Sequence, residues 1–155
     1  MSVTIIEGSL LDTDAHVICH QVNCQGKMNS GVAKAIRETW PKVFEEYSKH
    51  CKACTELNLS PLGNIQKVKV NNKQFVLNLF SQNKYGYDSK QYTSYDAFWN
   101  CLQDIKMMAP KGTKIAFPYG IGCVRGGANW SVIYTMIEEV LGLDYEVEIR
   151  RLDVG

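Results

Sequence analysis

With 155 residues, 45% of them hydrophobic and 21% charged, the chain has the length and composition of one globular domain that buries a substantial core. A formal net charge of +1 excludes broad electrostatic attraction to nucleic acid or to a membrane surface, although a local site for a small anion needs no such charge. The start of the chain lacks an apolar signal segment and no run is long enough to span a bilayer, so we expect a cytoplasmic protein that does not bind membranes.

The periodicity of the apolar residues predicts strands that alternate with helices. Short β-branched or continuous apolar runs indicate strands, and apolar residues three or four apart indicate helices. Asn129 is expected to cap the last helix. In chain order, we expect strands at residues 3–6 and 15–22, helices at 31–39 and from 41, a β-hairpin of 65–70 and 74–80, a helix from 93 to 109, a strand at 114–118, a helix at 130–141 and a strand at 145–152.

This order of elements predicts the fold class. Helices that alternate with strands have to cover both faces of a sheet, which gives a three-layer α/β/α sandwich. The hairpin adds an antiparallel pair, so the central sheet is expected to be mixed. No repeat, linker or low-complexity segment divides the chain, and we expect residues 1–155 to form a single domain.

Two glycine-rich loops each follow a predicted strand. Residues 23–31 connect a strand to a helix, and residues 119–129 read YGIGCVRGGAN. Free N–H groups at a helix N-terminus favour an anion, most often a phosphate, and ligands of such sheets bind at the carboxyl ends of strands. Two loops that present N–H groups to one crevice suit a diphosphate. The alternative is an ordinary connection in which Ser30 caps the helix.

The cysteines do not form a metal-binding pattern. Cys51 and Cys54 make one CxxC beside His50, but a zinc site usually needs a second pair, and the sequence has none. In a chain without a signal segment, we expect the six cysteines to be free thiols. We therefore expect no metal and no cofactor.

Four stretches carry a resemblance to a known family. They are VTIIEGSLL near the start, HQVNCQGKMNSGVAKAI from residue 20, NLFSQNKYGYDSKQYTSYDAF from residue 78 and FPYGIGCVRGGANWSVIYTMIEE from residue 117. Together they resemble a macro domain. The similarity is closest to the branch of ADP-ribose-1″-phosphate phosphatases and terminal ADP-ribose protein glycohydrolases, in which a loop such as His20-Gln21-Val22-Asn23 replaces Asn-Ala-Ala-Asn.

The resemblance implies an ADP-ribose crevice on a three-layer α/β/α fold. Ser9 and Leu10 correspond to the segment that meets adenine, and Ser9 stands where many macro domains have Asp. A hydroxyl is a less selective acceptor than a carboxylate, which leaves another diphosphate nucleotide open as the ligand. The other residues expected to bind the ligand are Asn29, Ser30, Gly31, Val32, Gln82, Gly120, Ile121, Gly122, Cys123, Val124, Arg125 and Gly126.

The resemblance also shapes the expected chemistry. Glycohydrolases of this branch use a lysine after the strand that matches residues 76–80 and an aspartate in the second glycine-rich loop, whereas this chain has Gln82 and Gly126. A covalent mechanism through lysine is therefore not expected. His20 is the candidate general base, because histidine titrates near neutrality, and Asn23 is expected to orient the ribose or a water. In the alternative, His20 is a histidine at the end of a strand that hydrogen-bonds the sheet and orients Asn23.

Other residues near the loops have two open interpretations each. Arg125 either reaches a phosphate or lies in solvent. Cys24 and Cys123 are either nucleophiles, which requires a lowered pKa, or small packing residues. Tyr85 and Tyr87 either cover the ligand or lie on a surface loop.

The expected function follows from the two loops and the resemblance. We expect a monomeric hydrolase that removes the 1″-phosphate of ADP-ribose 1″-phosphate or removes ADP-ribose from a modified macromolecule. Its partner is then ADP-ribose or a derivative, including ADP-ribosylated protein or nucleic acid. The alternative is a catalytically silent reader that only binds ADP-ribose, which the absence of the expected Lys and Asp favours.

Overall fold

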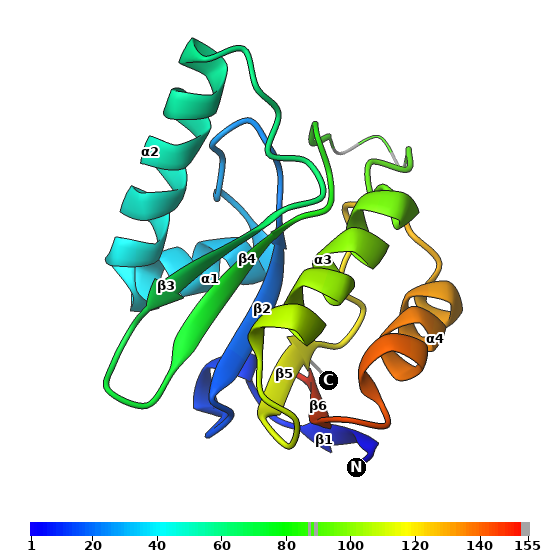
Figure 1. The fold of residues 1–155 in the computed structure, drawn as a ribbon. Coiled ribbons are helices and arrows are strands. Elements are labelled where there is room, and N and C mark those ends of the chain that lie inside the picture. Colours follow the sequence, from blue (N-terminus) through cyan, green and yellow to red (C-terminus); the bar gives the residue numbers. More distant parts are fainter. Residues whose placement is uncertain (87, 89, 153–155) are drawn as a thin grey trace.

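A six-stranded sheet in the order β1-β6-β5-β2-β4-β3 forms the centre of the computed structural model, which describes residues 1–86, 88 and 90–152 (Figure 1). Neighbouring strands are parallel except β3 and β4, which pair antiparallel as the predicted hairpin. The strands are β1 Val3–Glu7, β2 Val17–Val22, β3 Ile65–Lys69, β4 Phe75–Phe80, β5 Lys114–Pro118 and β6 Glu146–Arg151. The helices are η1 Leu10–Asp12 (a 3-10 helix), α1 Gly31–Thr39, α2 Pro41–Glu56, α3 Tyr95–Met108 and α4 Trp130–Leu141.

The helices cover the sheet on both faces (Figure 1), which confirms the predicted three-layer sandwich. Side chains of β2 alternate between two cores because successive residues of a strand point to opposite faces. Ile18 and Val22 pack with Ile36 of α1 and Val43 of α2. Cys19 packs in the other core, which α3 and α4 complete.

Local signals set the helix boundaries at or close to the predicted ones, and α3 begins at Tyr95, two residues later than expected. Pro41 is the first residue of α2, and Ser94 caps α3 by accepting from the Ala97 N–H. The Asn129 side chain caps α4, as predicted, by accepting from the N–H groups of Ser131 and Val132. None of the helices in the described part of the chain combines the length and the apolarity needed to cross a membrane.

The second strand begins two residues later than expected. Ala15 is fully buried, but its backbone N–H and carbonyl form hydrogen bonds with side chains and not with a neighbouring strand. Its N–H donates to Thr13 Oγ1 at 3.1 Å, and its carbonyl accepts from Gln74 Nε2 at 3.0 Å. Ladder pairing therefore starts at Val17, where β2 meets Phe75 of β4 and Ile115 of β5. Because β2 and β5 are parallel neighbours, the two glycine-rich loops leave the sheet at the same edge.

Candidate functional site

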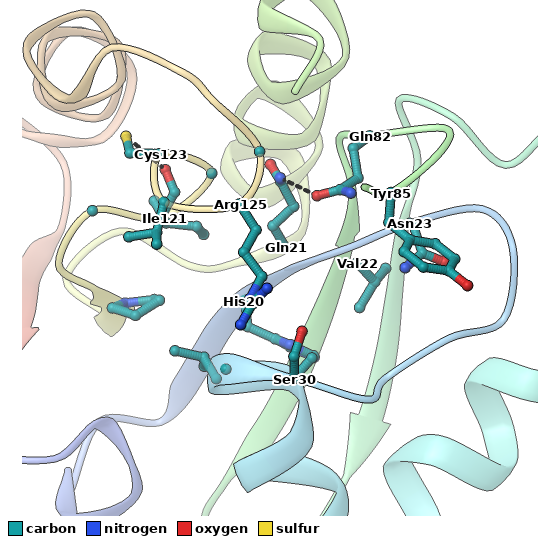
Figure 2. A pocket seen from close by; sticks show the side chains of 18 of the residues that line it. His20, Gln21, Val22, Asn23, Ser30, Gln82, Tyr85, Ile121, Cys123 and Arg125 are labelled. Carbon is teal, nitrogen blue, oxygen red and sulfur yellow. Dashed lines mark hydrogen bonds between the residues drawn. The ribbon is translucent and has the colours of Figure 1, made fainter. Parts of the chain in front are cut away.

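A cavity of about 290 Å³ lies where the two glycine-rich loops meet the ends of β2 and β5 (Figure 2). Its size is near the lower end of the range for small-molecule sites. The predicted site residues that line it are His20, Asn23, Asn29, Ser30, Gly31, Val32, Gln82, Gly120, Ile121, Gly122, Cys123, Val124, Arg125 and Gly126. The prediction that both loops converge on one crevice is therefore confirmed.

The N-terminus of α1 forms part of the cavity wall. Gly31, Val32 and Ala33 line the cavity, and the first N–H groups of an α-helix have no partner within the helix. Ser30 occupies the N-cap position, but its side chain makes no capping hydrogen bond. This end of α1 therefore offers backbone donors and the positive end of the helix dipole to an anion.

Asn23 holds the first loop in shape. Its Oδ1 accepts from the N–H groups of Gln25 at 2.9 Å and Lys27 at 3.3 Å, and its Nδ2 donates to the Lys27 carbonyl at 2.9 Å. The Tyr47 hydroxyl donates to this residue too, at 2.7 Å from the Asn23 carbonyl and 2.8 Å from Oδ1. These bonds explain why Asn23 is needed in the loop, and its expected action on a ribose or a water stays a prediction.

A network around Gln21 joins three loops, and residue types alone did not indicate it. Gln21 Nε2 donates to Gln82 Oε1 at 2.6 Å and to Thr93 Oγ1 at 2.9 Å. Ser81 Oγ donates to Gln21 Oε1 at 2.6 Å, and Thr93 Oγ1 donates to the Gly122 carbonyl at 2.8 Å. One feature of the sequence could have indicated this network: Gln21 is a polar residue in a buried strand, and its side chain points to the face opposite to His20.

Gln82 and Gly126, which stand where the resemblance implies Lys and Asp, are both built into this network. The Gln82 amide accepts from Gln21 and donates to the Lys84 carbonyl at 2.7 Å. A Cβ at Gly126 would meet Thr93 Oγ1 and the Gly122 carbonyl oxygen at less than contact distance. Among the described residues that line the cavity, the lysine is Lys27, which we did not predict as a site residue, and not Lys84.

His20 is buried in the cavity wall, with 1% of its surface exposed. Its Nε2 lies 2.5 Å from Asn78 Oδ1 on the neighbouring strand. Burial lowers the pKa of His20 to about 4, and the hydrogen bond to Asn78 opposes this shift only in part. The premise that His20 titrates near neutrality is therefore wrong: the imidazole is neutral at pH 7 and only a weak base. The hydrogen bond to the sheet, which was one half of the alternative, is present. The hydrogen bonds described above for Asn23 go to its own loop and to Tyr47.

The cysteines near the loops have the pKa shift opposite to the one a nucleophile needs. Burial raises the pKa of Cys24 to about 11 and also raises the pKa of Cys123. Neither thiol is therefore poised as a thiolate, and the packing interpretation holds. All six cysteines are free, and His50 Nε2 lies 3.7 Å from Cys54 Sγ. Within the described ranges, no three His, Cys, Asp or Glu residues are placed to hold a metal ion.

The remaining predicted residues divide between the cavity and other places. Arg125 extends from the second loop into the cavity, and Tyr85 lines its rim (Figure 2). Tyr87 lies outside the described residues. The cavity lining does not include Ser9, which caps η1 by accepting from the Leu11 N–H, or Leu10, which is buried. Their contact with a nucleobase stays a prediction.

A comparison with protein families decides what kind of domain carries this cavity. The model described as Macro domain matches residues 19–137, which includes both glycine-rich loops and the strands between them. The chain belongs to the macro domain family. The resemblance that the four sequence stretches predict is thereby confirmed.

Two curated relatives and a solved structure show how far the similarity extends. The ADP-ribose 1″-phosphate phosphatase of Neosartorya fischeri is 40% identical over 50 residues, which are 32% of this macro domain and 25% of the relative. The DNA ADP-ribosyl glycohydrolase of Mycobacterium tuberculosis is 23% identical over 128 residues, which are 83% of this chain and 35% of the relative. The solved structure, from Bacteroides thetaiotaomicron and described as a protein of unknown function, is 27% identical with a TM-score of 0.84, and the match covers 98% of this chain and 99% of that chain. This macro domain thus spans only a minor part of these two curated relatives.

Proposed function

We propose that this macro domain binds ADP-ribose and hydrolyses a terminal group from an ADP-ribose derivative. The observation that carries the proposal is that the N-terminus of α1 and the glycine-rich loop at residues 120–126 line one cavity. The first N–H groups of α1 have no partner within the helix and suit a phosphate. A glycine-rich loop beside them lets a second phosphate approach the backbone closely, so the pair suits a pyrophosphate.

The names of the relatives support two candidate reactions. One is removal of the phosphate of ADP-ribose 1″-phosphate, and the other is removal of ADP-ribose from a modified macromolecule, either protein or nucleic acid. Both reactions need a positioned water and stabilisation of developing negative charge. Loop N–H groups and the cations Arg125 and Lys27 are the groups at the cavity suited to this stabilisation.

A second candidate function, a reader that binds ADP-ribose without turnover, is favoured by a specific observation. The positions of the expected Lys and Asp carry Gln82 and Gly126. The Gln82 side chain is hydrogen-bonded to Gln21, and a side chain at residue 126 would collide with Thr93 and Gly122. A buried neutral His20 is also a weak general base. The two candidates share the binding step and differ in catalysis.

Calorimetric titration and product analysis test the two steps separately. We expect heat on titration with ADP-ribose, and the absence of heat at millimolar ligand would contradict the proposal. Turnover of ADP-ribose 1″-phosphate and of ADP-ribosylated protein or DNA is then followed for the wild type and for His20→Ala. Turnover by the wild type supports the hydrolase, and its loss in His20→Ala at saturating ligand would assign His20 a part in it; binding without any turnover supports the reader. His16→Ala, at an exposed histidine outside the cavity lining, is the control.

Removing the Tyr47 hydroxyl is expected to loosen the first loop. Tyr47→Phe loses the hydrogen bonds to Asn23 inside the core, which should lower the free energy of unfolding by about 1–2 kcal/mol. We expect the dissociation constant for ADP-ribose to rise about fivefold, as loss of about 1 kcal/mol implies. Urea unfolding and calorimetry measure the two effects.

Tyr145→Phe is the matched control. Tyr145 is also a buried tyrosine whose hydroxyl donates to backbone carbonyls, those of Lys106 and Ala109, on the far side of the sheet from the first loop. A similar loss of stability with unchanged affinity is expected. Equal losses of affinity in the two variants would show that Tyr47 acts only through global stability.

A further inference from the structure

A polar residue lies in the middle of a buried strand. Asn78 is fully buried within β4, whose other residues are apolar. The strand register places His20 of β2 on one side of it and Gln66 of β3 on the other. A buried amide is costly unless its donors and acceptor are paired, so its partners need an explanation.

These three side chains form a series of hydrogen bonds across three neighbouring strands, from α2 to the cavity wall. Gln66 Nε2 donates to the Glu46 carbonyl at 3.0 Å, and Asn78 Nδ2 donates to Gln66 Oε1 at 3.0 Å. Asn78 Oδ1 lies 2.5 Å from His20 Nε2. The series therefore begins at a main-chain carbonyl and ends in the cavity wall.

The Glu46 carbonyl sets the direction of every bond in the series. A backbone carbonyl can only accept, so Gln66 has to turn its NH₂ toward it and its oxygen toward Asn78. Asn78 then turns its own NH₂ toward Gln66 and its oxygen toward His20. An amide oxygen is only an acceptor, so the proton of the neutral imidazole lies on Nε2.

We propose that Asn78 and Gln66 are positioning residues that hold His20 as the Nε2–H tautomer, so that Nδ1 accepts a hydrogen bond from a hydroxyl of the bound ligand. The part that concerns the ligand rests on the proposed function. Asn78 and Gln66 do not line the cavity and act only through His20.

The unprotonated Nδ1 determines which part of the ligand can lie against His20. An unprotonated ring nitrogen attracts a donor and repels a group that only accepts. A ribose hydroxyl is a donor, whereas an ionised phosphate oxygen is not. The phosphates therefore belong at the backbone donors of the two loops, and a sugar hydroxyl belongs at His20. A site built to pair with a hydroxyl rejects an analogue that lacks it.

Two substitutions of Gln66 with opposite hydrogen-bonding character test the proposal. Gln66→Glu keeps an acceptor for Asn78 Nδ2, so we expect it to keep the Nε2–H tautomer. Gln66→Lys offers only donors, which turns the Asn78 amide around and moves the imidazole proton to Nδ1. Gln66 is half-buried, so the fold is expected to tolerate both changes. Gln74→Lys, at a half-buried glutamine outside the series that also donates to backbone carbonyls, is the matched control.

Nitrogen-15 spectra of histidine-labelled free protein at pH 8 report the tautomers directly. His16 is an internal reference, because its Nδ1 lies 2.6 Å from the Lys73 carbonyl and has to carry a proton. In the wild type, in Gln66→Glu and in Gln74→Lys, we expect the nitrogen-15 shifts of His20 to show the proton on Nε2, the reverse of His16. In Gln66→Lys, we expect them to show the proton on Nδ1, as in His16. ADP-ribose binding should weaken about tenfold in Gln66→Lys alone, as expected for loss of one buried hydrogen bond.

A proton on Nδ1 of His20 in the wild type would overturn the proposal, whatever the variants show. An unchanged tautomer in Gln66→Lys would overturn the role of Gln66. If the wild type does not bind ADP-ribose, the proposed function fails, and the tautomers of the free protein still decide the positioning roles. Loss of affinity in Gln74→Lys equal to that in Gln66→Lys would assign the effect to stability.

Discussion

Replacing Gly126 with aspartate is expected to abolish ADP-ribose binding, with a rise of at least about 100-fold in the dissociation constant, and to lower the free energy of unfolding by about 2–3 kcal/mol. The substitution introduces the residue type that the resemblance implies at this position. It cannot act there, because a Cβ at residue 126 meets Thr93 Oγ1 and the Gly122 carbonyl oxygen and lies 3.0 Å from Gln21 Nε2. The second glycine-rich loop has to move away from Thr93, and its backbone donors leave the cavity.

Gly126→Ala separates the steric effect from the charge of the aspartate, and we expect it to lose affinity almost as strongly. Gly112→Ala is the control for loss of a glycine. Gly112 has φ of 89° and lies far from the cavity, and its added Cβ would be 3.6 Å from Met1 Cε, so only backbone strain of about 1 kcal/mol is expected. Calorimetry and urea unfolding measure both quantities. Wild-type affinity in Gly126→Ala would show that the loop tolerates a side chain and would contradict this account of the cavity.

Acidification from pH 7 to pH 4 is expected to remove about 3 kcal/mol of stability through His20 alone. Burial lowers its pKa in the folded protein to about 4 from the ordinary value of 6.5. Between these two pH values the unfolded chain binds a proton that the folded protein does not, so the free energy of unfolding rises with pH across this window. The contribution is complete above about pH 6.5 and is lost below about pH 4.

Urea unfolding at several pH values compares the wild type with His20→Gln, which keeps a side-chain donor for Asn78. Protonation of carboxylates also destabilises the fold in acid. An example is Glu148: burial raises its pKa, but hydrogen bonds and the charge of Arg150 outweigh this effect and lower the pKa. Such carboxylates are common to both proteins, so the difference between the two pH profiles isolates His20. His16→Gln, at an exposed histidine, is the control for loss of an imidazole. Parallel profiles for the wild type and His20→Gln would mean that His20 titrates normally in the fold.

The same lowered pKa bears on catalysis. Because His20 is neutral from pH 5 to 8, it should cause no pH dependence of ADP-ribose binding across that range. Its low pKa makes His20 a hydrogen-bond acceptor and not an efficient general base. If turnover is found, its proton has to be taken by another group or by the substrate itself.

The sequence by itself determined the elements and the place of the cavity. Apolar periodicity predicted the six strands and four helices to within a few residues, because the pattern records which face of each element is buried. Local capping residues such as Asn129 marked helix starts through contacts with their immediate neighbours. The two glycine-rich loops could be assigned to one edge because the carboxyl ends of parallel neighbours meet there.

Only the tertiary structure decided what the side chains of the cavity do. His20 pairs with Asn78, 58 positions away, and Gln21 with Thr93, 72 positions away, and neither pairing leaves a pattern in the sequence. The pKa of His20 depends on the depth of its burial, and the room at Gly126 depends on where Thr93 and Gln21 lie. The capping role of Ser9 and its place outside the cavity lining also became visible only in the structure, and its contact with a nucleobase stays a prediction. Hydrogen-bond partners, dielectric environment and free volume arise from contacts between segments distant in the chain, whereas periodicity and capping are local.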